Sequence, residues 1–292
     1  MDKAVLLDKI RNKASVYAIE IAKLNISNEK KAGKINKEIL AYRDKEIEKI
    51  IEKNLPYDEQ LDAILLITYV TNVVMLEARN TFWKYDYMAF ARRIGEIWEP
   101  FCKLPFIYPV KKLQLYAPPS FADIHQALKC KIDTLVQGTD LPDFTKNELL
   151  QYYSQVWQLI DSGNINLSLD LHFEQNGVFY DVDYKSGFSS NEKGNTNRLL
   201  LVGSIYDSLE EVHKNLMFVR QPEEENNHYL QTLKNSPYWK VYCFDEAYAK
   251  IHEFTGFDLK AWMNANMDWH NDISIEFKDY LTRENLLKYL TW

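Results

Sequence analysis

The segment INLSLDLHFEQNGVFYDVDYK, residues 165–185, reads as two alternating strands joined by a tight turn. Asn176-Gly177 is the dipeptide most typical of a two-residue β-hairpin, because both turn positions need a positive φ angle. Counting the register outward from such a turn places Asp170 directly opposite Asp183. The segment therefore predicts a hairpin that brings two carboxylates together near its open end.

The charged side chains of this hairpin fall on one face. Side chains alternate between the two faces of a strand, so Asp170, Asp183 and Lys185 point the same way. Two carboxylates directly opposite each other repel and destabilise a sheet, which indicates a cation between them. Asp oxygens suit Mg²⁺ or Mn²⁺, especially where water and phosphate oxygens complete the shell. His172 falls opposite Asp181 on the same face, and we expect it to be a structural hydrogen-bonding group rather than a base.

The composition is that of a globular chain. It has 292 residues, of which 46% are hydrophobic and 26% charged, enough for one large domain or two modest ones. Its three cysteines lie far apart without zinc-like spacing, which favours reduced thiols and a cytoplasmic location. We expect no signal peptide and no membrane span, because the longest apolar stretch, 63–69, is too short. The net charge of −7 counts against general nucleic-acid binding, although a metal nuclease needs acids in its site.

The order of elements predicts the fold class. Apolar spacing predicts helices over 3–24, 27–53, about 58–80 and about 83–100. Capping boxes at Ser120 and Thr145 begin two more helices before the hairpin. After the hairpin the order is helix, strand, helix, strand and helix. This alternation predicts an α/β fold with a central mixed β-sheet flanked by helices.

The hairpin also carries a recognisable spacing. Asp170, twelve intervening residues and then Asp183-Tyr184-Lys185 resemble the PD-(D/E)XK signature of the restriction-endonuclease-like nuclease superfamily. In that superfamily the two acids lie on adjacent strands of a mixed sheet and bind Mg²⁺. This sequence departs from the signature at one position, because Leu169 stands where the signature has a proline.

The resemblance implies an arrangement for the whole chain. It places a restriction-endonuclease-like nuclease domain at residues 83–292, with a helical insertion at about 101–161. Residues 1–82 form an N-terminal helical region that would be a scaffold, a dimer contact or a DNA clamp. The loop 186–198, rich in Ser, Asn and Gly, is similar to the loop after this lysine in type II restriction endonucleases.

A third acid is expected from a helix. Members of the superfamily often supply one ahead of the sheet in a pattern like G-x-x-x-E, and Gly95 and Glu99 occupy those places. Gly95 would allow close approach of a backbone or a ligand. Glu96 lies beside them, and Glu148 is a rival whose capping-box role already explains it. An exposed pair of Arg and Glu on one helix face explains the same pattern equally well.

Taken together, the resemblance implies a Mg²⁺-dependent type II restriction endonuclease, with Mn²⁺ able to replace Mg²⁺. Such an enzyme cuts double-stranded DNA at a specific sequence and leaves 5′-phosphate ends. The expected catalytic residues are Asp170, Asp183, Lys185 and Glu99. The expected metal ligands are Asp170, Asp183, Glu99 and Glu96. The expected DNA contacts, in the loop and the following helix, are Lys193, Asn195, Asn197 and Arg198.

Two other functions remain open at this point. One is a nuclease of the same fold that acts in repair, recombination or phage defence without tight sequence specificity. The other is a non-catalytic DNA-binding protein that keeps the fold. Because enzymes that cut both strands commonly act as dimers, the first interpretation also predicts a homodimer.

Overall fold

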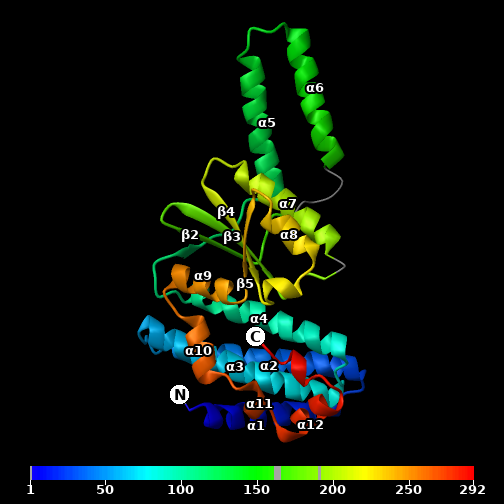
Figure 1. The fold of residues 1–292 in the computed structure, drawn as a ribbon, viewed down its shortest axis with the longest axis vertical. Coiled ribbons are helices and arrows are strands. Elements are labelled where there is room, and N and C mark those ends of the chain that lie inside the picture. Colours follow the sequence, from blue (N-terminus) through cyan, green and yellow to red (C-terminus); the bar gives the residue numbers. More distant parts are fainter. Residues whose placement is uncertain (1, 161–165, 190–191) are drawn as a thin grey trace.

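A helical layer, a central β-sheet and a projecting pair of helices make up the molecule (Figure 1). The structure is a computed structural model, and it describes residues 2–160, 166–189 and 192–292. Ile165 of the expected hairpin and residues 190–191 of the following loop lie outside the described residues. The sheet is mixed and lies between helices, so the expected α/β class is confirmed.

The first part of the chain is helical. Four long helices follow one another: α1 (Lys3–Ala22), α2 (Asn28–Ile51), α3 (Tyr57–Phe82) and α4 (Tyr87–Ile107). The expected end of the last helix at Pro100 is wrong, since α4 continues through Pro100 and Pro105. A proline inside a helix removes a backbone hydrogen bond. Phe101 and Phe106 are fully buried on this part of α4, and their packing offsets that loss.

Five strands form one sheet in the order in which they occur in the sequence. They are β1 (Gln114–Leu115), β2 (Leu171–Gln175), β3 (Val178–Lys185), β4 (His213–Val219) and β5 (Trp239–Cys243). The β1–β2 and β2–β3 pairs are antiparallel, whereas β3–β4 and β4–β5 are parallel. Parallel neighbours need a crossover, and α7 (Lys193–Asp207) and α8 (His228–Lys234) supply the two crossovers.

The hairpin forms with the expected register. Asn176 and Gly177 have φ angles of 56° and 79°, as a type I′ turn requires. His172 pairs with Asp181 across the ladder. The ladder ends at the pair of Leu171 and Val182, earlier than expected, and Asp170 lies in a bend immediately before β2. The first acid therefore stands at the open end of the hairpin rather than within the strand.

The two faces of the sheet pack against different helices. Val182 and Tyr184 of β3 join a core that includes α4 and α9 (Asp245–Thr255). Met217 and Val219, which pair with Asp183 and Lys185 in β4, join a second core with α7 and α8. The acid pair therefore belongs to the α7 side of the sheet.

An antiparallel pair of helices projects from the sheet (Figure 1). It consists of α5 (Phe121–Gln137) and α6 (Asp143–Ile160). The capping box at Ser120 forms as expected, with reciprocal contacts to Asp123. The other expected start is wrong, because α6 begins two residues before Thr145 and that residue lies in its first turn.

The C-terminal segment returns to the N-terminal helices. It contains α10 (Leu259–Asn266), α11 (Trp269–Asp272) and α12 (Ile275–Arg283), and short 3₁₀ turns occur at Glu223–Glu225 and Leu287–Tyr289. Asp272 accepts hydrogen bonds from Lys3 Nζ (2.9 Å) and Tyr69 Oη (2.7 Å). One apolar core thus runs from α1 through α3 and α4 to α12 and one face of the sheet.

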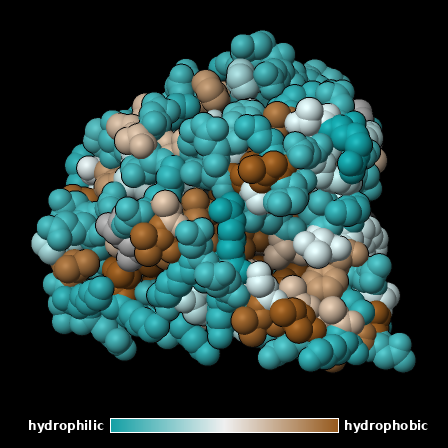
Figure 2. Space-filling model, turned by 90° about the horizontal axis from the view of Figure 1, so that it is seen from below, coloured by the Kyte–Doolittle hydropathy of each residue, from teal (hydrophilic) through white to brown (hydrophobic). Residues whose placement is uncertain are grey.

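Helix α3 is long and apolar enough to cross a membrane by length and composition. In the structure 83% of its most apolar window is buried inside the protein, as in the central helix of a folded domain. The underside of the molecule, formed by helices of this layer, shows apolar atoms among hydrophilic ones (Figure 2). Val5, Val16 and Ile19 of α1 and Ile275 of α12 are exposed apolar residues.

Candidate metal centre

The two acids of the hairpin lie together. Asp170 is half-buried, and its Oδ2 accepts the backbone N–H of Tyr184 at 2.8 Å. Asp183 is buried, with 4% of its surface exposed. The pKa of Asp183 is raised to about 7, mainly by burial and then by the neighbouring Asp170 carboxylate. Lys185 and Arg198 oppose this shift.

One carboxylate oxygen of this pair has no partner. Asp183 Oδ2 is buried and makes no hydrogen bond with the described residues. A buried carboxylate oxygen without a donor is costly, because it has lost water and gained nothing. A proton shared with Asp170 or a cation would each offset that cost. The site is therefore electrostatically incomplete when it is both ionised and empty of positive charge.

Two cationic side chains stand beside the pair. Arg198 Nη2 lies 3.9 Å from Asp183 Oδ1, while its Nη1 donates to the backbone oxygen of Asn166 at 3.4 Å. Lys185 is half-buried, and its ammonium makes no hydrogen bond or ion pair with the described residues. An unpaired lysine next to an acid pair is free to contact a negatively charged ligand.

The donor set fits a hard divalent cation. Mg²⁺ commonly binds through one or two carboxylates and keeps several waters that phosphate oxygens can replace. Asp183 Oδ2 is buried without a hydrogen-bond partner in the described structure, and Asp170 beside it accepts its backbone hydrogen bond through Oδ2. Within the described ranges, no group of three or more His, Cys, Asp and Glu side chains could hold a metal. The acid pair thus matches an open site rather than a closed structural one.

The expected third and fourth ligands are not gathered at the pair. Glu99 forms an ion pair with Lys103 at 2.5 Å, and both belong to α4. Glu96 is exposed and pairs with Arg92 and Arg93 at 3.3 and 3.2 Å. Their positions on α4 explain this outcome, because α4 packs on the face of β3 opposite to Asp183.

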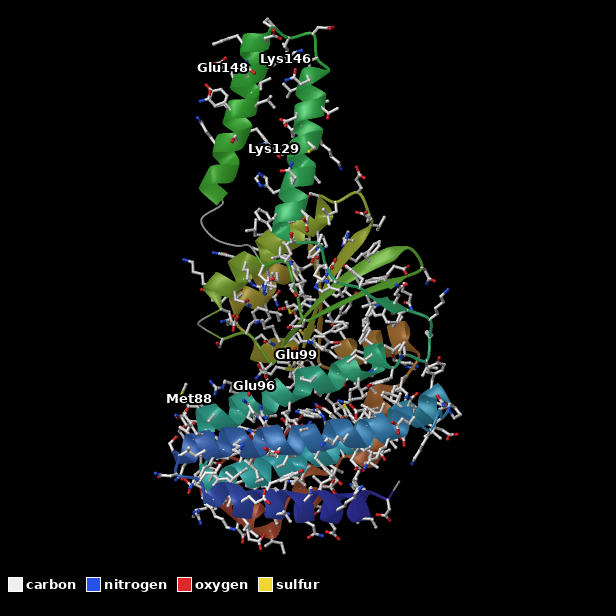
Figure 3. The ribbon with its side chains drawn as sticks, turned by 180° about the vertical axis from the view of Figure 1, so that it is seen from behind. Met88, Glu96, Glu99, Lys129, Lys146 and Glu148 are labelled. Atoms are coloured by element: carbon white, nitrogen blue, oxygen red, sulfur yellow. The ribbon has the colours of Figure 1, made fainter. Side chains whose placement is uncertain are left out.

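Glu99 nevertheless acts on Tyr184, the residue after the second acid. The Asp170 and Glu99 carboxylates both act electrostatically on the buried Tyr184 hydroxyl. Figure 3 shows Glu96 and Glu99 on α4 beneath the sheet, whereas Glu148 lies far away on the projecting helix α6. Glu148 is therefore not placed to complete the site.

The glycine in the same helix pattern does permit close approach. A Cβ atom on Gly95 would lie 2.7 Å from Ser186 Oγ and 2.8 Å from its Cβ. Ser186 directly follows Lys185, and its Oγ accepts a hydrogen bond from Arg220 Nε at 3.0 Å. Helix α4 thus supports the segment that ends β3, which explains the glycine without a bound ligand.

The residues expected to contact DNA line the start of α7. Lys193 and Asn197 are exposed, and Asn195 donates to Glu192 Oε2 at 3.2 Å. Arg198 alone of the four touches the acid pair. The helix begins after Glu192, and no side chain of that residue caps the N–H groups of its first turn.

A buried polar network lies beside the acids, and the sequence predicts only one of its contacts. Asp181 is fully buried and accepts hydrogen bonds from His172, His213 and Tyr116. Burial alone would raise the pKa of Asp181, but these three hydrogen bonds hold it below its usual value. The hairpin register predicts the contact between His172 and Asp181, whereas the other two partners come from distant parts of the chain.

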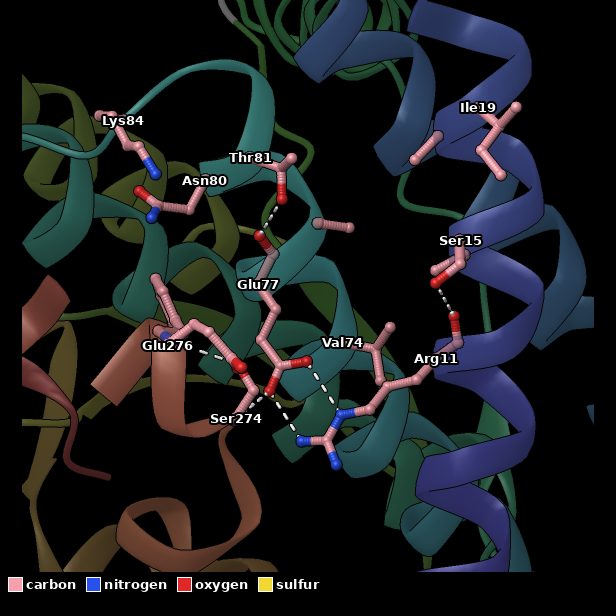
Figure 4. Close-up of a pocket in the computed structure, with 14 residues that line it drawn as sticks. Arg11, Ser15, Ile19, Val74, Glu77, Asn80, Thr81, Lys84, Ser274 and Glu276 are labelled. Atoms are coloured by element: carbon pink, nitrogen blue, oxygen red, sulfur yellow. Dashed lines mark hydrogen bonds and ion pairs between the residues drawn. The ribbon is translucent and has the colours of Figure 1, made fainter. Parts of the chain in front are cut away.

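A separate pocket of about 550 Å³ lies between α1, α3 and α12 (Figure 4). Two of its charged groups pair with each other, since Arg11 forms two hydrogen bonds with Glu77 at 3.0 and 2.8 Å. Glu77 also accepts the N–H of Ser274 at 2.6 Å. These contacts join the first and last helices, while exposed Lys84 and Glu276 also line the pocket.

Comparison of the chain with models of protein families, with curated proteins and with solved structures finds no significant match.

Proposed function

We propose that the protein is a Mg²⁺-dependent endonuclease that hydrolyses double-stranded DNA at a specific sequence. In this proposal the sheet is a restriction-endonuclease-like core. An antiparallel hairpin that carries the acids, followed by two parallel strands with α7 and α8 as crossovers, supports that interpretation. The proposal includes a cytoplasmic location.

The unpaired oxygen of Asp183 carries the proposal. Asp183 is buried with one oxygen that has no partner, and it lies next to half-buried Asp170 and a lysine without a partner. This arrangement destabilises the fold unless the protein binds a cation and an anion there. A purely structural hairpin would gain stability by replacing one of these acids. A phosphodiester with its metal supplies both charges at once.

Each residue then has a role in hydrolysis. Asp170 and Asp183 would hold Mg²⁺, which when bound neutralises phosphate charge and helps a water to lose its proton. Lys185 orients the attacking water and stabilises charge on the phosphate. Water oxygen bonds to phosphorus, the bond to the 3′ oxygen breaks, and that oxygen takes up a proton. The products are a 5′-phosphate and a 3′-hydroxyl.

DNA would reach the site along the start of α7. Arg198 is anchored at Asn166 and faces the acid pair, so it is placed to contact the phosphate that is cut or its neighbour. Lys193, Asn195 and Asn197 precede it by up to one and a half turns and would contact the flanking DNA. We propose a homodimer because two such sites are needed to cut both strands in one encounter.

A digest of several DNAs in Mg²⁺ tests this proposal. Discrete fragments of plasmid and phage DNA that carry 5′-phosphates are the expected products. Smears or structure-dependent nicks would contradict sequence specificity and favour a repair, recombination or defence nuclease. Binding without cutting, in both Mg²⁺ and Mn²⁺, would reject the enzyme and leave a DNA-binding protein.

A further inference from the structure

A buried imidazole holds the bend that carries Asp170. Leu169, the residue before this acid, is buried, and its backbone N–H donates to His172 Nε2 at 2.9 Å. Without this acceptor the N–H would be buried and unsatisfied, because the bend lies outside the ladder of β2. His172 therefore acts on the peptide group that leads into the first acid.

The same imidazole is fixed at its other nitrogen. His172 Nδ1 lies 2.7 Å from Asp181 Oδ1. Because Nε2 accepts a hydrogen bond, the ring proton of the neutral imidazole is on Nδ1 and is donated to Asp181. The two hydrogen bonds define both the tautomer and the orientation of the ring. A carboxylate that fixes a histidine in this way is a familiar support for metal ligands and their neighbours.

Both carboxylate oxygens of Asp181 accept hydrogen bonds. It is fully buried, and Tyr116 Oη donates to its Oδ1 while His213 Nδ1 donates to its Oδ2 at 2.7 Å. Asp181 also lies in β3 two residues before Asp183, on the same face of the sheet. One network of hydrogen bonds thus connects the strand that carries the second acid to the bend that carries the first.

The network accounts for the departure from the PD-(D/E)XK signature. A proline before the first acid would have no N–H and would restrict the backbone by itself. Leu169 has an N–H and a freer backbone. Its buried N–H therefore needs an acceptor, and its backbone needs another restraint. The lone pair of His172 Nε2 satisfies the donor and fixes the peptide.

We propose that His172 is a positioning residue for Asp170, acting through the Leu169 N–H, and that its bond to Asp181 aligns the two acids for one divalent cation. This inference rests on the proposed function. It assigns His172 no contact with substrate or metal.

His172→Phe tests the inference, with His213→Phe as its matched control. Each variant removes one buried imidazole from Asp181, but only the first leaves the Leu169 N–H without an acceptor. We expect His172→Phe to weaken Mn²⁺ binding, measured by titration calorimetry on the full chain, about tenfold. His213→Phe keeps the hydrogen bonds to Asp181 Oδ1, and we expect its Mn²⁺ affinity to match the wild type. Equal affinities for the two variants would overturn the proposal.

Two further variants separate positioning from general damage. The amide of His172→Gln can accept from Leu169 and donate to Asp181, so this variant should recover most of the lost affinity. In a Leu169→Pro background the donor is absent, and His172→Phe should then cause no additional loss. Failure of the Gln variant to recover affinity, or equal losses in both backgrounds, would contradict the assigned role.

One measurement does not depend on metal or cleavage. Hydrogen exchange of the Leu169 amide in the wild type should be slow, and it should accelerate in His172→Phe far more than in His213→Phe. Nitrogen-15 shifts of the His172 ring should report a neutral ring with its proton on Nδ1. If the wild type neither binds metal nor cuts DNA, the proposed function fails, while these two results still decide whether His172 holds the bend.

Discussion

At the scale of single residues, the ionisation of Asp183 gives the metal-free protein a characteristic pH dependence. The folded pKa of about 7 lies above the unfolded value of about 3.9. Between these values the folded state binds a proton that the unfolded state lacks, so the free energy of unfolding falls as the pH rises from about 4 to about 7. Above pH 7 the folded state also loses this proton, and the stabilisation that the proton supplied is gone.

Asp183→Asn removes that titration. We expect the variant to be more stable than the wild type at pH 8 without metal, and the difference in unfolding free energy to grow by up to about 1.4 kcal/mol per pH unit on the way up. Urea unfolding at several pH values measures it. Asp207→Asn, an exposed acid at the end of α7, should show no such slope. A wild-type stability that rises with pH relative to Asp183→Asn would contradict a raised pKa of the buried Asp183 carboxyl.

Metal binding should depend on pH in the opposite direction. A divalent cation replaces the proton of the acid pair, so the Mn²⁺ affinity of the wild type should rise about tenfold per pH unit below pH 7 and level off above it. Calorimetry in buffers of different ionisation enthalpy measures the proton released. Affinity that is independent of pH from 5 to 7 would show that Asp183 is already ionised in the free protein.

Lys185 should affect cleavage and leave metal binding intact. It carries no ligand oxygen, and its removal takes a positive charge away from the cation site. We expect Lys185→Ala to cut about 10²–10³ times more slowly in single-turnover assays, with Mn²⁺ affinity equal to or above that of the wild type. Lys240→Ala, an exposed lysine of β5, serves as the control. A parallel loss of metal affinity in Lys185→Ala would show a structural rather than a catalytic role.

At the scale of elements, the crossing of α4 and the end of β3 depends on a missing side chain. Gly95→Ala would force a Cβ against both side-chain atoms of Ser186, the residue after Lys185. We expect the variant to lose about 1–3 kcal/mol of unfolding free energy, measured in urea. Gly33→Ala at an exposed position of α2, where no atom lies within 4 Å of the added Cβ, should instead gain about 0.5–1 kcal/mol of unfolding free energy. A neutral Gly95→Ala would contradict the close contact.

Local signals explain what the sequence predicted of these elements. The turn residues Asn176 and Gly177 determine the register, and the register places His172 against Asp181. Asp170 lies beyond the ladder, in the bend before β2. The end of α4 could not be predicted, because Pro100 is a helix-breaking signal that only tertiary packing overrides. The remaining partners of Asp181 could not be predicted either, since they come from other strands and loops and no local pattern encodes such contacts.

At the scale of the whole molecule, the N-terminal helices and the sheet share one apolar core, and the C-terminal segment closes it. We expect urea to unfold the chain in a single cooperative transition. Circular dichroism and tryptophan fluorescence should report the same transition. Two separated transitions would show that residues 1–82 unfold independently.

The contact between the two ends of the chain should contribute to that transition. Asp272→Ala leaves the buried Tyr69 hydroxyl without its acceptor, and it removes the carboxylate from Lys3, whose Nζ still donates to the backbone oxygen of Asn266. We expect it to lower the unfolding free energy by about 1–3 kcal/mol with the transition still cooperative. Exposed Asp207→Ala is the control, and an equal stability of the two variants would contradict the importance of this contact.

The role of Asp183 in DNA cleavage is tested by comparing the wild type with Asp183→Asn on the same DNA. Both proteins would be incubated with an end-labelled duplex in Mg²⁺ under single-turnover conditions, after circular dichroism has shown both to be folded. We expect discrete products with 5′-phosphates from the wild type, and no cleavage by Asp183→Asn despite its greater stability without metal. Equal cleavage by the two proteins would show that Asp183 does not hold a catalytic metal ion.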